Sequence, residues 1–249
     1  MNAPAQPSKT VLLQVSGLCA WYGAAQILFD VELSLQRGEV LALMGRNGAG
    51  KSTTFKAIMG LTRRRAHTLD FMGHDIRHAR SHEIARLGLA YVPEDRRIFT
   101  DLTVAENLRT GRQPPRRWPD GTDLPAWDVD AVLELFPNLA PMLSRRADQM
   151  SGGEQQMLSV ARSLMGNPYV VLLDEPSEGV APIIVERMTA MIQAVRARGV
   201  SVLLSEQNLD FAGRVANRAI VLEKGQVAHQ GPMQVLMEDA ALRARYLGL

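Results

Sequence analysis

The chain has 249 residues, 46% of them hydrophobic, and a formal net charge of +2 at pH 7. Its length suits one large or two small domains, its hydrophobic content is enough for a substantial core, and its small charge gives no reason to expect nucleic acid as a partner. The single cysteine, Cys19, excludes an internal disulfide and a cysteine-based metal site, and no apolar run approaches the ~20 residues of a membrane-spanning helix.

The first 36 residues are expected to form a short lead and two strands. Residues 1–10 are polar, contain two prolines and lack the apolar centre of a signal peptide, so we expect a disordered lead. Residues 11–15 and 28–35 alternate apolar and polar side chains, as half-buried strands do. Trp21, Tyr22 and Gly23 are expected in a turn between them. Tyr22 is a candidate for stacking on a flat base, and capping of a sheet edge is the alternative.

Residues 45–52 form a complete Gly-x-x-x-x-Gly-Lys-Ser phosphate loop. An apolar strand is expected before it, over 40–44, and a helix after it, over 53–59, which is the context that this motif requires. The glycines let backbone amides point at a polyphosphate, Lys51 is expected to reach the β- and γ-phosphates, and Ser52 to bind Mg²⁺. The candidate nucleotide-binding residues are Gly45, Asn47, Gly48, Ala49, Gly50, Lys51, Ser52 and Thr53.

The next segment is expected to contain a strand over 68–72, a helix capped by Asp75 that runs through Leu87, and a strand over 89–92. His74, His78 and His82 could share one face of that helix. We reject a metal site there, because no carboxylate or cysteine completes a ligand set and arginines are interleaved. The short basic runs 63–65 and 116–117 are expected to be solvated loops.

From Glu94 to about Asp148 the pattern changes to a helical insertion. Helices are expected over 104–109 and 129–136, and the proline-bearing segment 113–127 is expected to be a mobile surface loop. An alternating pattern then returns, with strands over 169–173 and 200–204, a helix over 183–198 and a hairpin formed by 219–222 and 226–229. These elements predict an α/β fold with a mostly parallel core sheet, whose ligand binds at the carboxyl ends of the strands.

Two adjacent carboxylates end the strand over 169–173. Asp174 is placed to hold Mg²⁺, directly or through water, and Glu175 to orient or deprotonate an attacking water molecule. A salt-bridged strand end is the alternative, but strand ends beside a phosphate loop are where catalytic groups are expected. Together with the phosphate loop, the pair predicts an ATPase or GTPase.

Residues 151–156, Ser-Gly-Gly-Glu-Gln-Gln, precede a helix and lie shortly before Asp174. They resemble the Leu-Ser-Gly-Gly-Gln signature of the ATP-binding cassette (ABC) superfamily. Met150 and Glu154 depart from the common Leu and Gln, but the hydroxyl and both glycines are intact. The resemblance implies that Ser151, Gly152 and Gly153 contact the γ-phosphate of ATP bound to the opposite subunit of a head-to-tail dimer.

The resemblance also assigns single positions outside these motifs. Tyr22 resembles the aromatic residue under the adenine, Glu94 stands where most members have a Mg²⁺-sensing glutamine that faces the transmembrane partner, and residues 177–182 resemble the D-loop. Gln207 occupies the position of the switch histidine, and all five histidines lie elsewhere. A glutamine hydrogen-bonds a γ-phosphate but does not carry a proton, so Glu175 is expected to be the main base, with Lys51 and Gln207 as further catalytic residues.

The sequences Pro-Glu-x-Arg-Arg-x-Phe at 93–99 and Glu-Gln-Asn at 206–208 resemble those of an ATPase subunit of branched-chain amino acid importers. This resemblance implies a single ABC cassette over 11–249, with an antiparallel β subdomain and a helical subdomain over about 94–165. It implies ATP and Mg²⁺ as cofactors and a peripheral position on the cytoplasmic face of the inner membrane. The implied partners are two transmembrane permeases, a sister ATPase or a second copy, and, indirectly, a periplasmic substrate-binding protein.

Other functions are weighed against this one. Related importers for urea, short amides or aromatic acids use similar subunits. A soluble ABC ATPase that remodels nucleic acid or ribosomes usually has tandem cassettes, a long coiled coil or an iron–sulfur segment, none of which this sequence contains. Glu94 and Gln207 suggest a nucleotide sensor with impaired catalysis, but the intact Lys51, Ser52, Asp174 and Glu175 argue against it.

Overall fold

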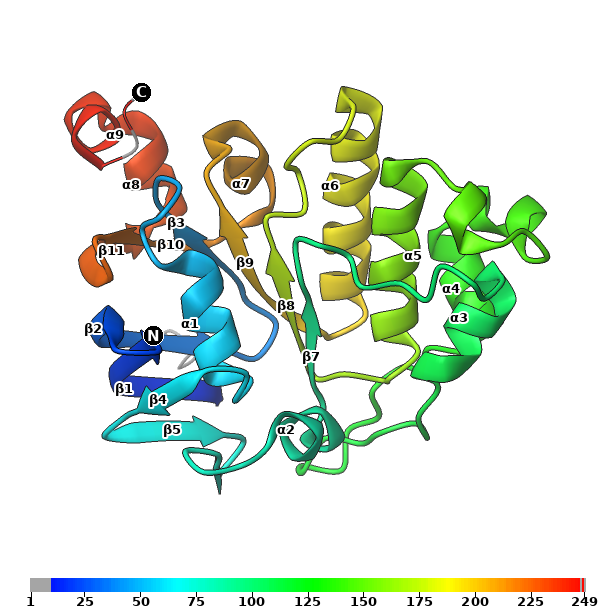
Figure 1. Ribbon diagram of the computed structural model, residues 1–249, viewed down its shortest axis with the longest axis horizontal. Helices are drawn as coiled ribbons and strands as arrows, with labels where there is room; N and C mark the ends of the chain where they lie inside the picture. Colours follow the sequence, from blue (N-terminus) through cyan, green and yellow to red (C-terminus); the bar gives the residue numbers. More distant parts are fainter. Residues whose placement is uncertain (1–9, 247, 249) are drawn as a thin grey trace, which may run out of the picture.

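Two β-sheets form the framework of the computed structural model, which describes residues 10–246 and 248 (Figure 1). The larger sheet has the order β11-β10-β3-β9-β8-β7, in which all neighbours are parallel except β11. Its strands are β3 (Val40–Met44), β7 (Leu89–Val92), β8 (Val170–Asp174), β9 (Ser201–Glu206), β10 (Arg218–Glu223) and β11 (Gln226–Pro232). Every residue of β3, β8 and β9 is buried, as expected for parallel strands covered on both faces. The predicted α/β fold with a mostly parallel core sheet is confirmed.

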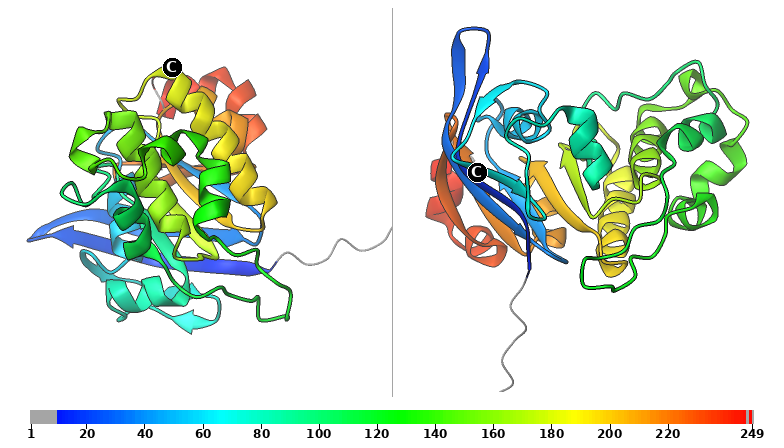
Figure 2. Two further views of the ribbon diagram at one scale, coloured as in Figure 1. Left: turned by 90° about the vertical axis from the view of Figure 1, so that its right-hand side faces the viewer. Right: turned by 90° about the horizontal axis from the view of Figure 1, so that it is seen from below.

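The smaller sheet is antiparallel. It consists of β1 (Val11–Tyr22), β2 (Ala25–Gln36), β4 (Arg63–Arg65), β5 (Thr68–Phe71) and β6 (His74–Asp75). The first two strands form a long hairpin that projects from the body of the protein (Figure 2, right). Both are longer than predicted, and Trp21 and Tyr22 lie in β1 instead of a turn. The alternation fails in the second half of β1, because this strand pairs with β2, β4 and β5 and carries irregular register, so consecutive residues are buried.

Helices cover the sheets and form a separate group at one end. The helices are α1 (Lys51–Ile58), α2 (Ser81–Leu87), α3 (Val104–Gly111), α4 (Val129–Leu135), α5 (Gly152–Leu164), α6 (Pro182–Ala197), α7 (Leu209–Val215), α8 (Met233–Glu238) and α9 (Ala240–Tyr246). The group of α3, α4 and α5 is inserted between β7 and β8 and lies far from the β1–β2 hairpin (Figures 1 and 2). No helix in the described part of the chain is long and apolar enough to cross a membrane. The predicted lead, apart from Thr10, lies outside the described residues.

The expected cap of the second helix, Asp75, was wrong. Asp75 lies in β6, and its carboxylate accepts hydrogen bonds from the backbone and side chain of Arg77. The helix begins only at Ser81, where the side chain of Glu83 accepts from the backbone N–H of Arg80. Since His74 lies in β6 and only His82 lies in α2, the histidines do not share a helix face.

Segment 113–127 was expected to be a mobile surface loop. This prediction was wrong in one respect, because the two tryptophans of the segment are packed in the interior. Trp118 and Trp127 are both buried. The guanidinium of Arg37 stacks over Trp118, whose ring lies against Tyr169. The backbone N–H of Trp127 donates to Asn167 Oδ1 at 2.7 Å. The prolines exclude regular structure in this segment, but the indole rings attach it to the core.

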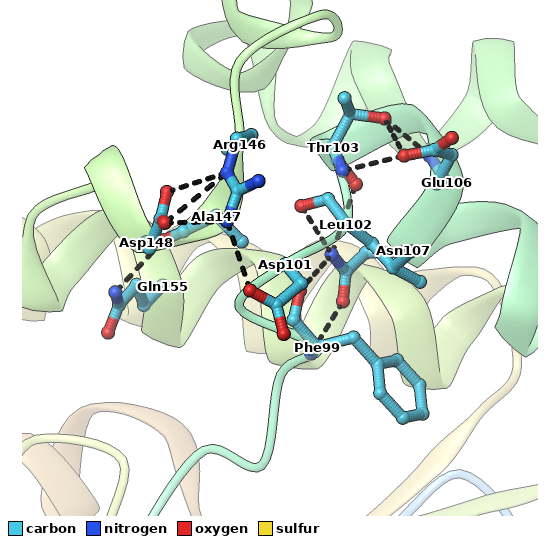
Figure 3. Close-up of polar contacts among 10 residues, drawn as sticks. All are labelled: Phe99, Asp101, Leu102, Thr103, Glu106, Asn107, Arg146, Ala147, Asp148 and Gln155. Carbon is cyan, nitrogen blue, oxygen red and sulfur yellow. Dashed lines mark hydrogen bonds and ion pairs between the residues drawn. The ribbon is translucent and has the colours of Figure 1, made fainter.

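The loop between β7 and α3 is held from inside by one amide side chain. Asn107 is fully buried; its Oδ1 accepts from Phe99 N at 2.9 Å, and its Nδ2 donates to the carbonyls of Phe99 and Thr103 (Figure 3). On the other side of the loop, Arg146 pairs with both Asp101 and Asp148 at 3.0 Å. These contacts fasten the loop to α3 and to the segment that leads into α5.

The basic run 63–65 was expected to be a solvated loop, but it forms β4, and Arg64 is half-buried. The guanidinium of Arg64 donates to the carbonyls of Ala57 and Ile58 at the end of α1, and to those of Ile76 and Ala79. One side chain therefore satisfies helix-end carbonyls that have no partner within the helix.

We expect Arg64→Lys to lower the free energy of unfolding by about 1–3 kcal/mol, because an ammonium group cannot reproduce the planar fork of a guanidinium that bonds several carbonyls. Urea unfolding of the full chain measures this loss. Arg65→Lys, at the exposed neighbouring position of the same strand, is the control and should be close to neutral. Equal losses for the two variants would contradict this role of Arg64.

Candidate nucleotide-binding site

The phosphate loop connects β3 to α1 at the carboxyl edge of the parallel sheet. Two of its glycines are required by space as well as by conformation. A Cβ on Gly45, whose φ is +149°, would lie 2.5 Å from the carbonyl oxygen of Leu222. A Cβ on Gly50, whose φ is +109°, would lie 2.8 Å from Leu28. The loop is thus pressed between β10 and the β1–β2 hairpin. It leads into the first turn of α1, whose backbone N–H groups have no partner within the helix and can bind an anion.

Lys51 is buried in the first turn of α1, with 3% of its surface exposed. Its ammonium group donates to the carbonyls of Gly45 at 2.7 Å and Arg46 at 3.2 Å. It also lies 3.0 Å from Glu175 Oε1. The sequence placed Lys51 at phosphates and Glu175 at a water molecule, and the structure brings the two side chains together as a buried ion pair.

The carboxylate of Asp174 has three hydroxyl donors from three different elements. Its Oδ1 accepts from the hydroxyls of Ser205 at 2.6 Å and Ser52 at 3.0 Å, and its Oδ2 accepts from Tyr91 at 2.9 Å. Burial and the charge of Asp174 raise the pKa of Tyr91 above its usual range, so its phenol stays a donor even in alkaline solution. The sequence analysis missed Tyr91 and Ser205. Ser205 is a polar residue inside an apolar strand, which is a usable signal, whereas Tyr91 gave none.

Mg²⁺ suits these oxygens. It prefers hard oxygen ligands, keeps several waters, and is commonly held by one or two carboxylates together with substrate phosphates. The hydroxyl of Ser52 and the carboxylate of Asp174 are adjacent at the mouth of the phosphate loop, so this donor set fits the ion. Glu94, the third expected ligand, is exposed and takes no part in the hydrogen bonds that hold Asp174.

Glu175 combines backbone strain with an unsatisfied oxygen. Its φ is +45°, a left-handed conformation that a non-glycine residue adopts only when its surroundings enforce it. Its backbone N–H is directed at Ser205, where the carbonyl and the hydroxyl both accept at 3.1 Å. Its Oε2 is buried and has no hydrogen-bond partner among the residues that the structure describes. Such an oxygen is a ready acceptor for a proton from water.

A second glutamate lies beside this base. Contact with Glu175 raises the pKa of Glu178 to about 7, and the charge of Glu94 adds to the effect. Glu178 is exposed, so solvent weakens the interaction. The exposed Glu94 and Glu178 therefore add negative charge next to the buried Glu175.

The signature residues lie at the start of α5, away from α1. Ser151 caps the helix: its Oγ accepts from Glu154 N, and Glu154 Oε2 accepts from Ser151 N at 2.7 Å. Glu154, a departure from the common signature, thus completes a capping box. Within the described residues, no hydrogen bond or ion pair joins 151–153 to the phosphate loop.

The turn that carries Glu94 is fastened to α5. Arg96 and Arg97 both have positive φ, at +62° and +47°. Ser159 Oγ donates to the carbonyl of Arg96, and Arg162 donates to that of Arg97, each at 2.6 Å. The guanidinium of Arg96 also lies so close to Gly152 that a Cβ there would meet it at 2.9 Å. The Glu94 turn and the signature residues are therefore both attached to α5.

Two further predicted residues, Tyr22 and Gln207, are exposed. Tyr22 is the last residue of β1, with 46% of its surface exposed, so its ring is free to stack on a flat ligand. Gln207 is exposed and directly follows β9, and Asn208 separates it from the first residue of α7. Glu206, between Ser205 and Gln207, is fully buried, and the sequence analysis assigned it no role of its own.

Comparisons with known proteins agree with this geometry. Residues 28–178 match the ABC transporter family. The chain is 40% identical over 237 residues to the high-affinity branched-chain amino acid transport ATP-binding protein BraG of Pseudomonas aeruginosa, covering 95% of this chain and all of BraG.

More distant relatives include an exporter component. The chain is 32% identical to the lipopolysaccharide export system ATP-binding protein LptB of Haemophilus influenzae, with 95% and 97% covered, and 32% identical to the probable branched-chain amino acid transport ATP-binding protein LivF of Archaeoglobus fulgidus, with 96% and 99% covered. A solved ATP-binding subunit of an ABC transporter superposes with a TM-score of 0.76 at 29% identity, covering 95% of this chain and 96% of that one.

We expect Ser205→Ala to lower ATP turnover by about 10- to 100-fold and to raise the Mg²⁺ concentration that gives half-maximal turnover, since Asp174 loses a donor that orients it. The measurement is steady-state hydrolysis titrated with Mg²⁺. Ser201→Ala is the matched control: Ser201 is buried on the same strand, but its hydroxyl accepts from Gly38 N at the opposite end. A Ser205→Ala protein with wild-type Mg²⁺ dependence would rule out this role.

Proposed function

This chain belongs to the ABC transporter family and is an ATPase whose hydrolysis of ATP is coupled to transport, and we propose that it drives uptake of branched-chain or other hydrophobic amino acids. The observation that carries the cargo class is the full-length similarity to BraG, which is greater than the similarity to LptB. The likeness to LptB makes export the second candidate. Uptake of urea, short amides or aromatic acids would need no change in this chain, because it never touches the cargo.

ATP is proposed to lie along the phosphate loop, with its base on Tyr22. The backbone of Gly45, Asn47, Gly48, Ala49, Gly50 and Thr53, together with Lys51, would surround the phosphates. Lys51 now donates to two carbonyls of its own loop and pairs with Glu175, and a γ-phosphate would offer it a stronger anionic acceptor. Release of Glu175 from Lys51 would then free a carboxylate at the moment when substrate is present.

Glu175 is proposed to take the proton of the attacking water. Three features support this role. Oε2 of Glu175 is buried and receives no hydrogen bond from the described residues, its backbone is held in a left-handed conformation, and it directly follows Asp174. Gln207 would orient the water or the γ-phosphate by hydrogen bonding. Mg²⁺, held by Ser52 and Asp174, would neutralise charge on the phosphates, and Glu94 is the further candidate ligand.

ABC ATPase subunits dimerise and work with transmembrane permeases. We propose that Ser151, Gly152 and Gly153 complete the nucleotide site of the opposite subunit, a sister ATPase rather than a second copy. The separation of α5 from α1 within one chain supports a composite site. Closure on ATP and reopening after hydrolysis would supply the motion that moves two permeases between inward-facing and outward-facing states.

A groove beside the Glu94 turn is the proposed contact with a permease. Its volume is about 450 Å³, and its lining includes Tyr91, Phe99 and Arg162. Phe99 is 51% exposed, and Arg162 stacks over its ring. An exposed aromatic residue next to a hollow is a typical anchor site for a protein partner. This contact would hold the chain on the cytoplasmic face of the inner membrane, and a periplasmic substrate-binding protein would act only through the permeases.

We expect Glu175→Gln to bind ATP with little change in affinity and to lose at least about 10²-fold of its turnover, because a neutral amide cannot accept the proton of water. Nucleotide binding by the full chain and hydrolysis by the assembled complex measure the two properties separately. Glu186→Gln, on the exposed surface of α6, is the control. Substantial residual hydrolysis in Glu175→Gln would refute its role as the base.

The proposed partners are tested by purifying the tagged chain from gently solubilised membranes and identifying its companions by mass spectrometry. We expect two polytopic membrane proteins and a second ATPase. Transport of leucine, isoleucine and valine by the reconstituted assembly, compared with urea and short amides, then tests the cargo. Recovery with lipopolysaccharide-export components would favour the second candidate, and recovery with ribosomes and no membrane protein would overturn both.

A further inference from the structure

Glu206 is a buried carboxylate for which hydrolysis gives no obvious use. It ends β9, with 1% of its surface exposed, and it forms no ion pair with any residue in the described part of the chain. Burial raises its pKa, because a charged group loses its hydration in the interior. A carboxylate in such surroundings is costly unless hydrogen bonds satisfy it, so its partners should explain why it is there.

Those partners are two backbone amides from two different loops. Ser177 N donates to Glu206 Oε1 at 3.0 Å, and Asn208 N donates to Glu206 Oε2 at 3.2 Å. Each oxygen of the carboxylate therefore accepts one N–H group. An ionised carboxylate only accepts hydrogen bonds, so this arrangement matches the charged form without the need for a proton. No ion pair reaches it in the described residues, so the hydroxyl of Ser177 and these two amides, which all lower its pKa, offset part of the cost of burial.

The two amides flank the two groups that are expected to act on the γ-phosphate. Ser177 lies two residues after Glu175 and opens the turn in which Glu178 and Gly179 are exposed. Asn208 lies directly after Gln207 and caps α7, since its side chain accepts from Phe211 N at 3.1 Å. The carboxylate of Glu206 thus bridges the backbone of the exposed turn and the backbone of the Gln207 loop.

We propose that Glu206 is a positioning residue that joins the exposed turn 177–180 to the Gln207 loop, so that a displacement of the turn by a partner subunit also moves Gln207. This inference rests on the proposed dimeric ATPase, in which the turn would meet the partner. The link is short and buried, and loss of either amide leaves a charged oxygen unsatisfied, which makes independent movement of the two loops unfavourable. Glu206 touches no substrate in this scheme and acts through its neighbours.

The substitution that tests this is Glu206→Gln, which keeps the shape of the side chain but replaces one acceptor oxygen with an NH₂ group. That group cannot accept from a backbone N–H, so one of the two loops is released. The matched control is Glu39→Gln. Glu39 is likewise buried, with 6% exposure; it accepts from Gln36 N at 2.8 Å and pairs with Arg218, but it precedes β3 at the opposite end of the sheet.

We expect the Glu206→Gln complex to lose about 10- to 100-fold in kcat, the range typical of groups that orient a reacting side chain, while its KM for ATP stays close to that of wild type. In the full chain alone, hydrogen exchange at the amide of Ser177 or Asn208 should become faster. Glu39→Gln should lower Tm but preserve kcat and the exchange of both amides.

Three results would overturn the proposal: wild-type kcat in Glu206→Gln, unchanged exchange at both amides, or an equal loss of kcat in Glu39→Gln. A fall in kcat that accompanies a proportionate loss of ATP binding would also contradict it, because that pattern indicates general damage to the site. If the wild-type complex hydrolyses no ATP, the proposed function fails instead, and amide exchange in the chain alone still decides whether Glu206 holds the two loops.

Discussion

The architecture depends on one carboxylate at the end of β8. Asp174 receives hydrogen bonds from three elements that are distant in the sequence: Ser52 on α1, Tyr91 on β7 and Ser205 on β9. Because these strands are parallel, their carboxyl ends meet at one edge, and the phosphate loop leaves the sheet at the same edge. The carboxylate is buried, and the three donors that hold it are hydroxyl groups. The fold therefore fixes the orientation of the proposed metal ligand through contacts within the chain.

The same edge also places the proposed base, Glu175, beside the residue that restrains its backbone. Glu175 follows Asp174 with a strained backbone that Ser205 stabilises through its carbonyl and hydroxyl. Ser205 thus donates its hydroxyl proton to the carboxylate of Asp174 and accepts from the backbone N–H of Glu175. Glu206 continues this arrangement one residue later by accepting amides on either side of the site. Residues 205 and 206 at the end of β9 therefore hold neighbouring loops in place by hydrogen bonds, and residue 207 follows directly.

The sequence was sufficient wherever the chemistry is local. The phosphate loop, the apolar parallel strands, Asp174, Glu175 and the helical insertion were all predicted from contiguous residues, and the structure contains each of them. Tyr91 and Ser205 were missed because their roles arise from contacts between neighbouring strands. The polar Ser205 at the end of an apolar strand was a usable signal, but the residues around Tyr91 gave none. Asp75 was misplaced because its carboxylate engages Arg77 before a helix can begin. The length of β1 and the buried position of Arg64 likewise depend on pairing with segments that are remote in sequence.

The fastening of the Glu94 turn has a mechanical consequence. The carbonyls of Arg96 and Arg97 are bound by α5, whereas Val92, four residues earlier, is paired with β8 in the sheet. If the helical group rotates against the sheet, the part of the turn beyond Arg96 must travel with the helices and the part before Pro93 must stay with the strands. The torsion is then concentrated in the three residues 93–95, which makes Glu94 the centre of a hinge. The charge of Glu94 helps to raise the pKa of Glu178, so a rotation at this hinge would change the electrostatic field beside Glu178.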